Sequence, residues 1–170
     1  MVRALRGWDA RSALTAIAGA GSAALLAAAL GFQAAGYAPC DLCVMQRWPH
    51  LAAALIAIAA VLTGGDRSWA WVGALSLALA TFLAAYHAGI ELDLWDGPSK
   101  CAGAADIAGL SVQDLMARIE AAPLVRCDEV QWRFLSLSMA AWNAIMSAGL
   151  TGVWLMAALI SHKRDGGAPG

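Results

Sequence analysis

The amino-acid sequence predicts an all-α membrane protein: a bundle of four transmembrane helices with a short amphipathic helix in its second loop. Hydrophobic residues make up 61% of the 170 positions, well above the composition of a soluble domain. Asp, Glu, Lys and Arg are absent from four long stretches, 12–40, 48–65, 68–90 and 134–162. A helix needs roughly 20 apolar residues to cross a bilayer and must satisfy its own backbone hydrogen bonds there, so each stretch predicts one helix. We place the four spans at 13–34, 47–63, 69–90 and 138–160.

The positions of the basic residues predict the orientation. They gather at the N-terminus, in the turn at 64–68 and in the C-terminal tail, as Arg3, Arg6, Arg11, Arg67, Lys163 and Arg164. The positive-inside rule places these segments in the cytoplasm. The loops at 35–46 and 91–137 then face the other side, where the longer one carries eight acidic and four basic residues. We expect a single membrane domain over 1–170 in a bacterial inner membrane, with cytoplasmic termini and all four cysteines in the oxidising periplasm.

Within the longer loop, residues 111–121 predict a short amphipathic helix. Ser111 is a candidate N-cap with Asp114 three positions later, and Pro123 ends the pattern. One apolar stripe is formed by Val112, Leu115, Met116 and Ile119. Such a helix either lies in the membrane interface or packs on the core of its own loop. The net charge of −1 gives no indication of a nucleic-acid partner.

The first cysteine pair is a C-x-x-C motif at the start of the second span. Cys43 lies in the first turn of that helix, near the positive end of its dipole, and Arg47 follows on the same face. Both effects stabilise a thiolate at Cys43. The motif therefore favours redox chemistry. A metal site and a structural disulfide stay open as alternatives, although the disulfide would close only a very small loop.

The second pair, Cys101 and Cys127, lies in the long polar loop. As a structural disulfide it would close a loop around the amphipathic helix. As a functional disulfide it could exchange with a soluble dithiol protein. The C-x-x-C motif on the same side of the membrane favours exchange. No Met- or His-rich segment accompanies the cysteines, which weighs against metal transfer, and we predict no metal ligands.

Five short groups of residues carry a resemblance that covers nearly the whole chain. They are Pro39-Cys40-x-x-Cys43-x-x-Gln46-Arg47, Tyr86-His87-x-Gly89-Ile90-Glu91, Trp95-x-Gly97-Pro98-x-x-Cys101, Arg126-Cys127-Asp128-Glu129-x-x-Trp132 and Ser138-Met139-Ala140-x-Trp142-Asn143. With these residues the chain resembles the DsbB family, inner-membrane quinone reductases that re-oxidise the periplasmic thiol oxidase DsbA. Some DsbB-like proteins serve a dedicated partner instead.

The resemblance implies a route for electrons. Reduced DsbA would attack a Cys101–Cys127 disulfide at Cys101, and electrons would pass to Cys40–Cys43 through a transient Cys40–Cys127 link. The Cys43 thiolate would then reduce a bound quinone, either ubiquinone or menaquinone, which would return to the membrane lipid as quinol.

The same resemblance places Arg47 beside the quinone and associates His87 with it; the alternative for His87 is an interfacial histidine bonded to a backbone carbonyl. Gln46 either donates a hydrogen bond to a quinone oxygen or caps loop backbone. His50 is left without a role. Gln33 and Asn143 are expected to bond across helices, and the acidic residues Glu91, Asp128 and Glu129 are expected to be solvated loop charges. A membrane thiol protein that binds metal is the alternative function.

Overall fold

The computed structural model describes residues 9–98, 111–121 and 125–160. Its four long helices are α1 (Ala10–Ala34), α2 (Asp41–Thr63), α3 (Arg67–Glu91) and α5 (Met139–Leu159), and each is long and apolar enough to cross a membrane. The predicted fold class is therefore confirmed. Of the predicted boundaries, the start of the second span differs most, because α2 begins at Asp41 and not at 47. Cys40 is the N-cap of α2, so Asp41 and Arg47 both lie within the first turns of this helix.

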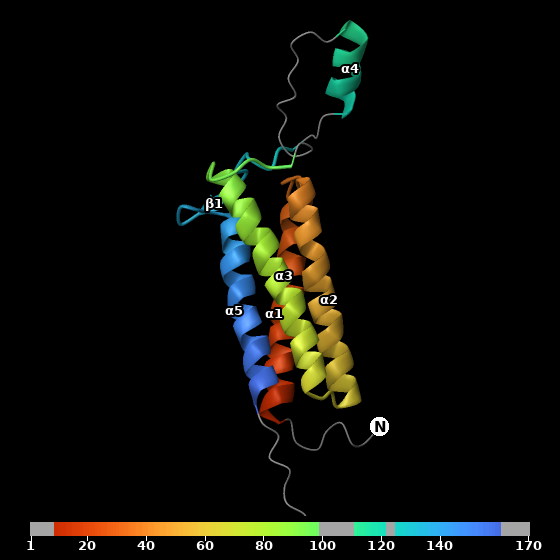
Figure 1. Cartoon of the computed structure of the whole chain (residues 1–170), viewed down its shortest axis with the longest axis vertical. Coiled ribbons are helices and arrows are strands. Elements are labelled where there is room, and N and C mark those ends of the chain that lie inside the picture. Colours follow the sequence, from red (N-terminus) through yellow and green to blue (C-terminus); the bar gives the residue numbers. More distant parts are fainter. Residues whose placement is uncertain (1–8, 99–110, 122–124, 161–170) are drawn as a thin grey trace, which may run out of the picture.

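The four helices form an antiparallel bundle (Figure 1). α1 packs against α2 and α5, and α3 packs against the same two helices. A turn after the left-handed C-cap Gly64 joins α2 to α3. Arg11, near the start of α1, donates to the carbonyls of Ala157 and Ile160 at the end of α5. The start of α1, the α2–α3 turn and the end of α5 thus lie at one end of the bundle, and the cysteine motif lies at the other.

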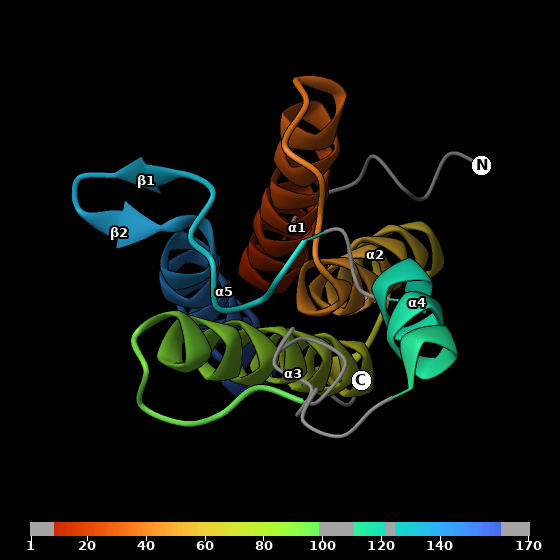
Figure 2. The ribbon, with the colours of Figure 1, turned by 90° about the horizontal axis from the view of Figure 1, so that it is seen from above.

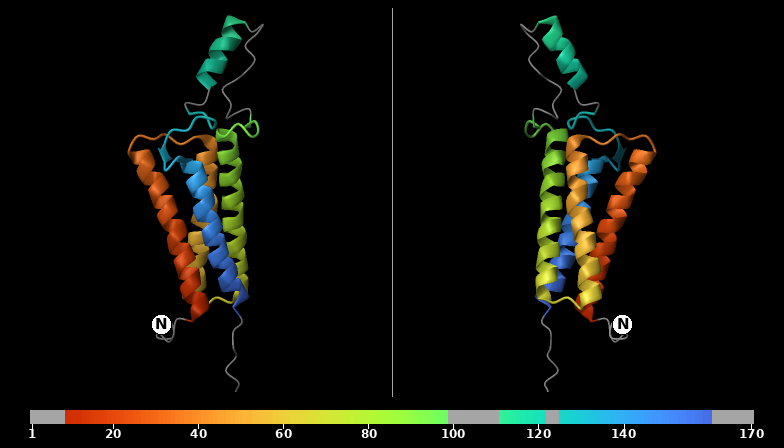
Figure 3. Two further views of the ribbon diagram at one scale, coloured as in Figure 1. Left: turned by 90° about the vertical axis from the view of Figure 1, so that its left-hand side faces the viewer. Right: turned by 90° about the vertical axis from the view of Figure 1, so that its right-hand side faces the viewer.

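Small residues bring the helices together in the core. The Cα of Gly19 on α1 faces Ala57 on α2 so closely that a Cβ at position 19 would overlap the Ala57 methyl group. Gly73 on α3 makes the same close approach to the buried ring of Trp154 on α5. Close backbone contact replaces the hydrophobic effect as the source of helix association in a bilayer. α1 nevertheless leans away from its neighbours toward the cysteine end (Figure 3).

The segment between α3 and α5 contains two further elements. The amphipathic helix α4 (Val112–Ala121) begins after Ser111, whose Oγ lies 3.2 Å from the backbone nitrogen of Asp114 as in a capping box. This confirms the predicted helix and its N-cap, whereas Pro123 lies outside the described residues. A short hairpin, β1 (Arg133–Phe134) and β2 (Leu137–Ser138), was not predicted.

The hairpin escapes sequence analysis because its turn lacks the usual residues. Leu135 and Ser136 both have positive φ, at 49° and 65°, where Asn or Gly is normally found. From above, the segment that precedes β1 crosses the cysteine end of the bundle (Figure 2). This crossing places Cys127 against the start of α2, where Cys40 and Cys43 lie.

Candidate active site

The C-x-x-C pair is held at the start of α2. The Sγ of Cys40 accepts a hydrogen bond from the backbone nitrogen of Cys43, and the two sulfurs lie 3.0 Å apart. Cys40 is only 4% exposed. The hydrogen bond with Cys43, together with burial, raises the pKa of the Cys40 thiol to about 12. Cys40 therefore keeps its proton and donates it toward Cys43, which stabilises negative charge on the Cys43 sulfur.

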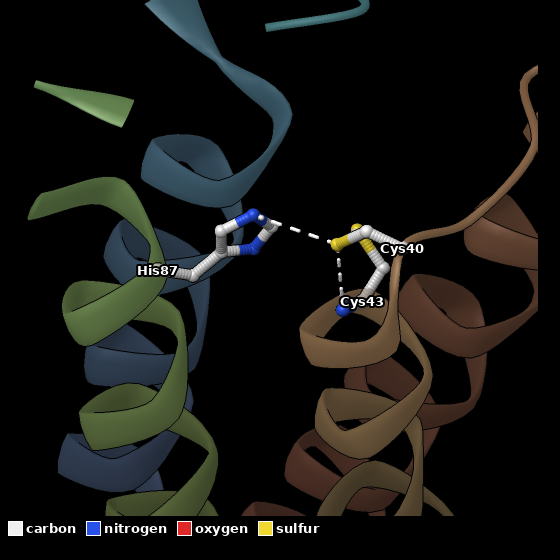
Figure 4. Close-up of side chains that lie close together, drawn as sticks. All are labelled: Cys40, Cys43 and His87. Atoms are coloured by element: carbon white, nitrogen blue, oxygen red, sulfur yellow. Dashed lines mark hydrogen bonds between the residues drawn. The ribbon is translucent and has the colours of Figure 1, made fainter. Parts of the chain in front are cut away.

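His87 reaches this pair from the last turns of α3 (Figure 4). Its Nε2 lies 3.6 Å from the Sγ of Cys40 and 3.2 Å from the backbone oxygen of Cys127. The ring is 3% exposed, so these contacts are buried. The sequence prediction of His87 as a site residue concerned the quinone, and the structure adds a direct contact with the cysteines.

Cys127 packs into the same cluster. It is 1% exposed and lies in an apolar group with Cys40, Leu42 and Ile90. The structure thus brings one cysteine of the long loop against the C-x-x-C pair. Cys101 lies outside the described residues, so its predicted disulfide with Cys127 stays a prediction.

Charged neighbours flank Cys127 on the loop. The Arg126 guanidinium holds the pKa of the Asp128 carboxyl below its usual value through a hydrogen bond and ion pair. Glu129 lies 3.5 Å from the same guanidinium and its side chain is 68% exposed. The expectation of a solvated charge thus fits Glu129, whereas Asp128 is tied to Arg126.

Further polar side chains of α2 and α5 form a hydrogen-bonded group that contacts the Nδ1 side of the His87 ring. Gln46 is 5% exposed, and its Nε2 lies 3.0 Å from the Nδ1 of His87. Asn143 of α5 donates to the Oε1 of Gln46 at 2.7 Å, and its Oδ1 lies 3.1 Å from the Nε2 of His50. The predicted bonds of Asn143 and Gln33 across helices are confirmed, since Gln33 of α1 accepts from Arg47 of α2 at 2.6 Å.

A cavity of about 440 Å³ lies beside the cysteines. Three elements supply most of its walls: α1, the start of α5 and the segment before β1. Its apolar lining includes Leu25, Leu26, Phe32, Trp132, Phe134, Trp142 and Met146. Its polar lining includes the functional candidates Cys40, Cys43, Gln46, Arg47, His50, His87, Glu91 and Asn143.

Arg47 lines this cavity, and its guanidinium is only partly hydrogen-bonded. Its Nη1 bonds to Gln33, but its Nε is buried and has no hydrogen-bond partner among the described residues. Leaving a buried donor unpaired costs free energy, so a ligand oxygen that reached this nitrogen would stabilise it. We expected Arg47 to stabilise a thiolate at Cys43, but the hydrogen bond at that sulfur comes from Cys40, and Arg47 bonds to Gln33 of α1.

The position of Glu91 differs from the one expected from the sequence. It is not a solvated loop charge, because it ends α3, its side chain is 7% exposed, and it accepts a hydrogen bond from Ser138. One carboxylate oxygen lies 4.0 Å from the Nε2 of His87. The only sequence signal for this placement is the spacing of four residues from His87, which puts both on one helix face.

The fold and the site define a class: a helical membrane protein with a C-x-x-C dithiol and a buried histidine at one end of its bundle, next to a largely apolar cavity. The chain belongs to the DsbB family, since the family described as "Disulfide bond formation protein DsbB" matches residues 11–157. It is therefore a multi-pass membrane protein of disulfide bond formation and acts as a disulfide oxidoreductase. The predicted family is confirmed.

Curated relatives named "Disulfide bond formation protein B" agree over most of their length. The protein of Polaromonas naphthalenivorans is 30% identical over 169 residues, covering 91% of this chain and 96% of the relative. That of Aromatoleum aromaticum is 31% identical over 166 residues, covering 85% and 90%. That of Methylococcus capsulatus is 35% identical over 135 residues, covering 75% and 82%. No solved structure is significantly similar to the chain.

Proposed function

We propose that this protein re-oxidises a DsbA-like thiol oxidase and passes the electrons to a membrane quinone. The observation that carries the proposal is the position of the Cys40–Cys43 dithiol, which lies between Cys127 and the apolar cavity. In this proposal one integral membrane domain sits in a bacterial inner membrane, with the cysteine end in the periplasm. The basic residues at the other end support that orientation.

The first half of the reaction is disulfide exchange. The dithiol of the partner reduces a Cys101–Cys127 disulfide and leaves as a disulfide, so two electrons and two protons enter the loop pair. The loop dithiol then reduces a Cys40–Cys43 disulfide in the same balanced way. The burial of Cys127 in one cluster with Cys40 supports a transient link between these two sulfurs.

The second half returns the C-x-x-C pair to its disulfide. A quinone would supply the oxidant, since it accepts two electrons and two protons to become a quinol. The cavity suits it, because its size lies in the ordinary range of ligand sites and its walls are largely apolar. Arg47 would offer its unpaired Nε to a ring oxygen, Gln46 and His87 would line the same site, and the hydrogen bond from Cys40 keeps Cys43 ready to react.

The test is a quinone reduction assay with purified protein, reduced DsbA and a soluble ubiquinone analogue. We expect catalytic loss of the oxidised quinone absorbance that depends on DsbA. Cys43→Ser should abolish quinone reduction, while Cys101→Ser should abolish oxidation of DsbA and leave direct reduction of quinone by chemically reduced protein intact. Normal turnover in either variant contradicts the assigned route. A menaquinone analogue and a dedicated partner are the substitutes if the first pair is inactive.

One observation favours a second candidate, metal binding. The ligand atoms of Cys40, Cys43 and His87 all lie within 4.8 Å of one another, and two thiolates with an imidazole suit Zn²⁺. A zinc titration of the reduced protein distinguishes the two functions. Stoichiometric tight binding in a protein that shows no quinone reduction would support the metal function instead.

A further inference from the structure

A chain of hydrogen bonds runs through the bundle beneath the cysteines. It links His50 and Gln46 of α2, Asn143 of α5 and His87 of α3, and it ends at the backbone oxygen of Cys127. All three α2 and α3 members are at most 5% exposed. Because each member can donate at some atoms and only accept at others, the fixed ends of the chain determine where its protons lie.

The surroundings of the His87 Nε2 require a proton on that nitrogen. Three acceptors face it: the Cys127 carbonyl oxygen at 3.2 Å, the Cys40 sulfur at 3.6 Å and a Glu91 carboxylate oxygen at 4.0 Å. A carbonyl oxygen has no proton to give, so the Nε2 of His87 is the donor in that bond.

The amide side chains then determine whether the other ring nitrogen of His87, Nδ1, carries a proton. The Oδ1 of Asn143 faces His50 and the hydroxyl of Ser147, so its amide nitrogen points to the Oε1 of Gln46. The amide nitrogen of Gln46 consequently donates to the Nδ1 of His87. Nδ1 accepts and carries no proton, and all bonds of the chain run in one direction, which strengthens each of them.

We propose that Gln46 and Asn143 are positioning residues that hold His87 as the neutral Nε2–H tautomer. His87 then shares its single Nε2–H between the Cys127 carbonyl oxygen and the Cys40 sulfur, as a fixed donor and not as a base for the Cys40 proton. That proton has its own route, since the Cys40 thiol already points at the Cys43 sulfur 3.0 Å away.

The effect of this tautomer on the oxidation of the Cys40–Cys43 dithiol rests on the proposed function. Both sulfurs must lose their protons when the dithiol gives up two electrons and closes to a disulfide. Cys40 is the harder of the two, because burial and the hydrogen bond with Cys43 raise the pKa of its thiol, while the hydrogen bond from His87 acts in the opposite direction. A donor locked at Nε2 therefore stabilises the negative charge that Cys40 must carry.

The tautomer is tested by ¹⁵N NMR of histidine-labelled protein, which distinguishes Nε2–H, Nδ1–H and the imidazolium ion. We expect His87 to be neutral with its proton on Nε2. In Asn143→Asp the new carboxylate can only accept, so the amide nitrogen of Gln46 should turn toward it. The amide oxygen of Gln46 then faces the His87 ring, and Nδ1 should gain a proton to donate to it. Gln46→Glu should do the same from α2.

Thr81→Val is the matched control, since Thr81 shares α3 with His87 and lies outside the chain of hydrogen bonds; it should leave the tautomer unchanged. An imidazolium or an Nδ1–H tautomer in the wild type would overturn the proposal. So would an unchanged His87 signal in both acidic variants.

A pair of substitutions at His87 separates a donor from a base. His87→Gln brings an amide N–H to the place of Nε2 but cannot accept a proton, whereas the shorter His87→Asn reaches only the place of Nδ1. We expect His87→Gln to reduce quinone about tenfold or more faster than His87→Asn, the difference made by one hydrogen bond to a charged group.

Equal activity in the two variants would show that a donor at the place of Nε2 does not assist Cys40 and would overturn the proposal. If the wild type reduces no quinone at all, the proposed function fails, while the NMR result still decides the tautomer.

Discussion

The Sγ of Cys40 lies 3.6 Å from the Nε2 of His87, although 47 positions separate them in the chain. The contact follows from the bundle. Because α2 and α3 run antiparallel and are joined by a short turn, the start of α2 and the end of α3 lie at the same end. The thiol pair and its histidine are thus fixed to two packed helices, which hold a site more firmly than a loop does.

The first prediction concerns the pH dependence of Cys40. Its pKa of about 12 in the reduced protein exceeds the ordinary thiol value of 9.0, so Cys40 stays protonated through neutral pH. Unfolding then releases a proton at alkaline pH, and the reduced protein loses stability as pH rises from 9.0 toward 12. Alkylation of Cys40, followed by peptide mass spectrometry, should keep rising beyond pH 9 without a plateau.

Cys43→Ser provides the control for this measurement. The hydrogen bond with Cys43 is the largest cause of the raised pKa, so its removal should move the alkylation profile of Cys40 toward lower pH. Identical profiles in both proteins would contradict this cause.

The second prediction concerns Arg47. Lysine keeps the positive charge at this position but has no group equivalent to the unpaired Nε. We expect Arg47→Lys to raise the KM for the quinone analogue by about tenfold, the effect of losing one good hydrogen bond. Gln33→Leu is the matched variant, because it removes the partner of Nη1 and leaves Nε in place; its KM should change little. A normal KM in Arg47→Lys would exclude Nε as the contact.

The third prediction concerns the link between the two cysteine pairs. In the double variant Cys43→Ser, Cys101→Ser, the remaining Cys40 and Cys127 lie in one buried cluster. Mild oxidation should join them within one molecule, as seen by mass spectrometry of non-reduced peptides. The same oxidation in denaturant should give little of this product. Equal yields under both conditions would mean that the fold does not bring the two sulfurs together.

The fourth prediction concerns packing of α1. Gly19→Ala places a methyl group against Ala57, which forces α1 and α2 apart and should cost about 1–3 kcal/mol of unfolding free energy. Gly31→Ala, on the same helix, meets no atom within 4 Å and should be neutral or slightly stabilising. Thermal unfolding in a fixed detergent compares the two. Equal melting temperatures would contradict the close approach at Gly19.

The sequence by itself determined the features that depend on neighbouring residues. Hydropathy predicted the four spans, because a helix can cross a bilayer when it is long enough and apolar enough. Ser111 predicted the start of α4, and the C-x-x-C motif predicted that Cys43 lies in the first turn of α2. Hydropathy alone marks only the apolar part of α2, from 47, because it does not report the cap at which the helix begins.

Only the tertiary structure decided what surrounds the cysteines. Gln46 and Asn143 are 97 positions apart, and their bond depends on how α2 and α5 are rotated about their axes. Alanine-rich helices that are apolar on every side carry little periodic signal for that rotation. The burial of Glu91 and the hydrogen bonds of His87 therefore follow from which helix faces meet, because buried polar groups need hydrogen-bond partners.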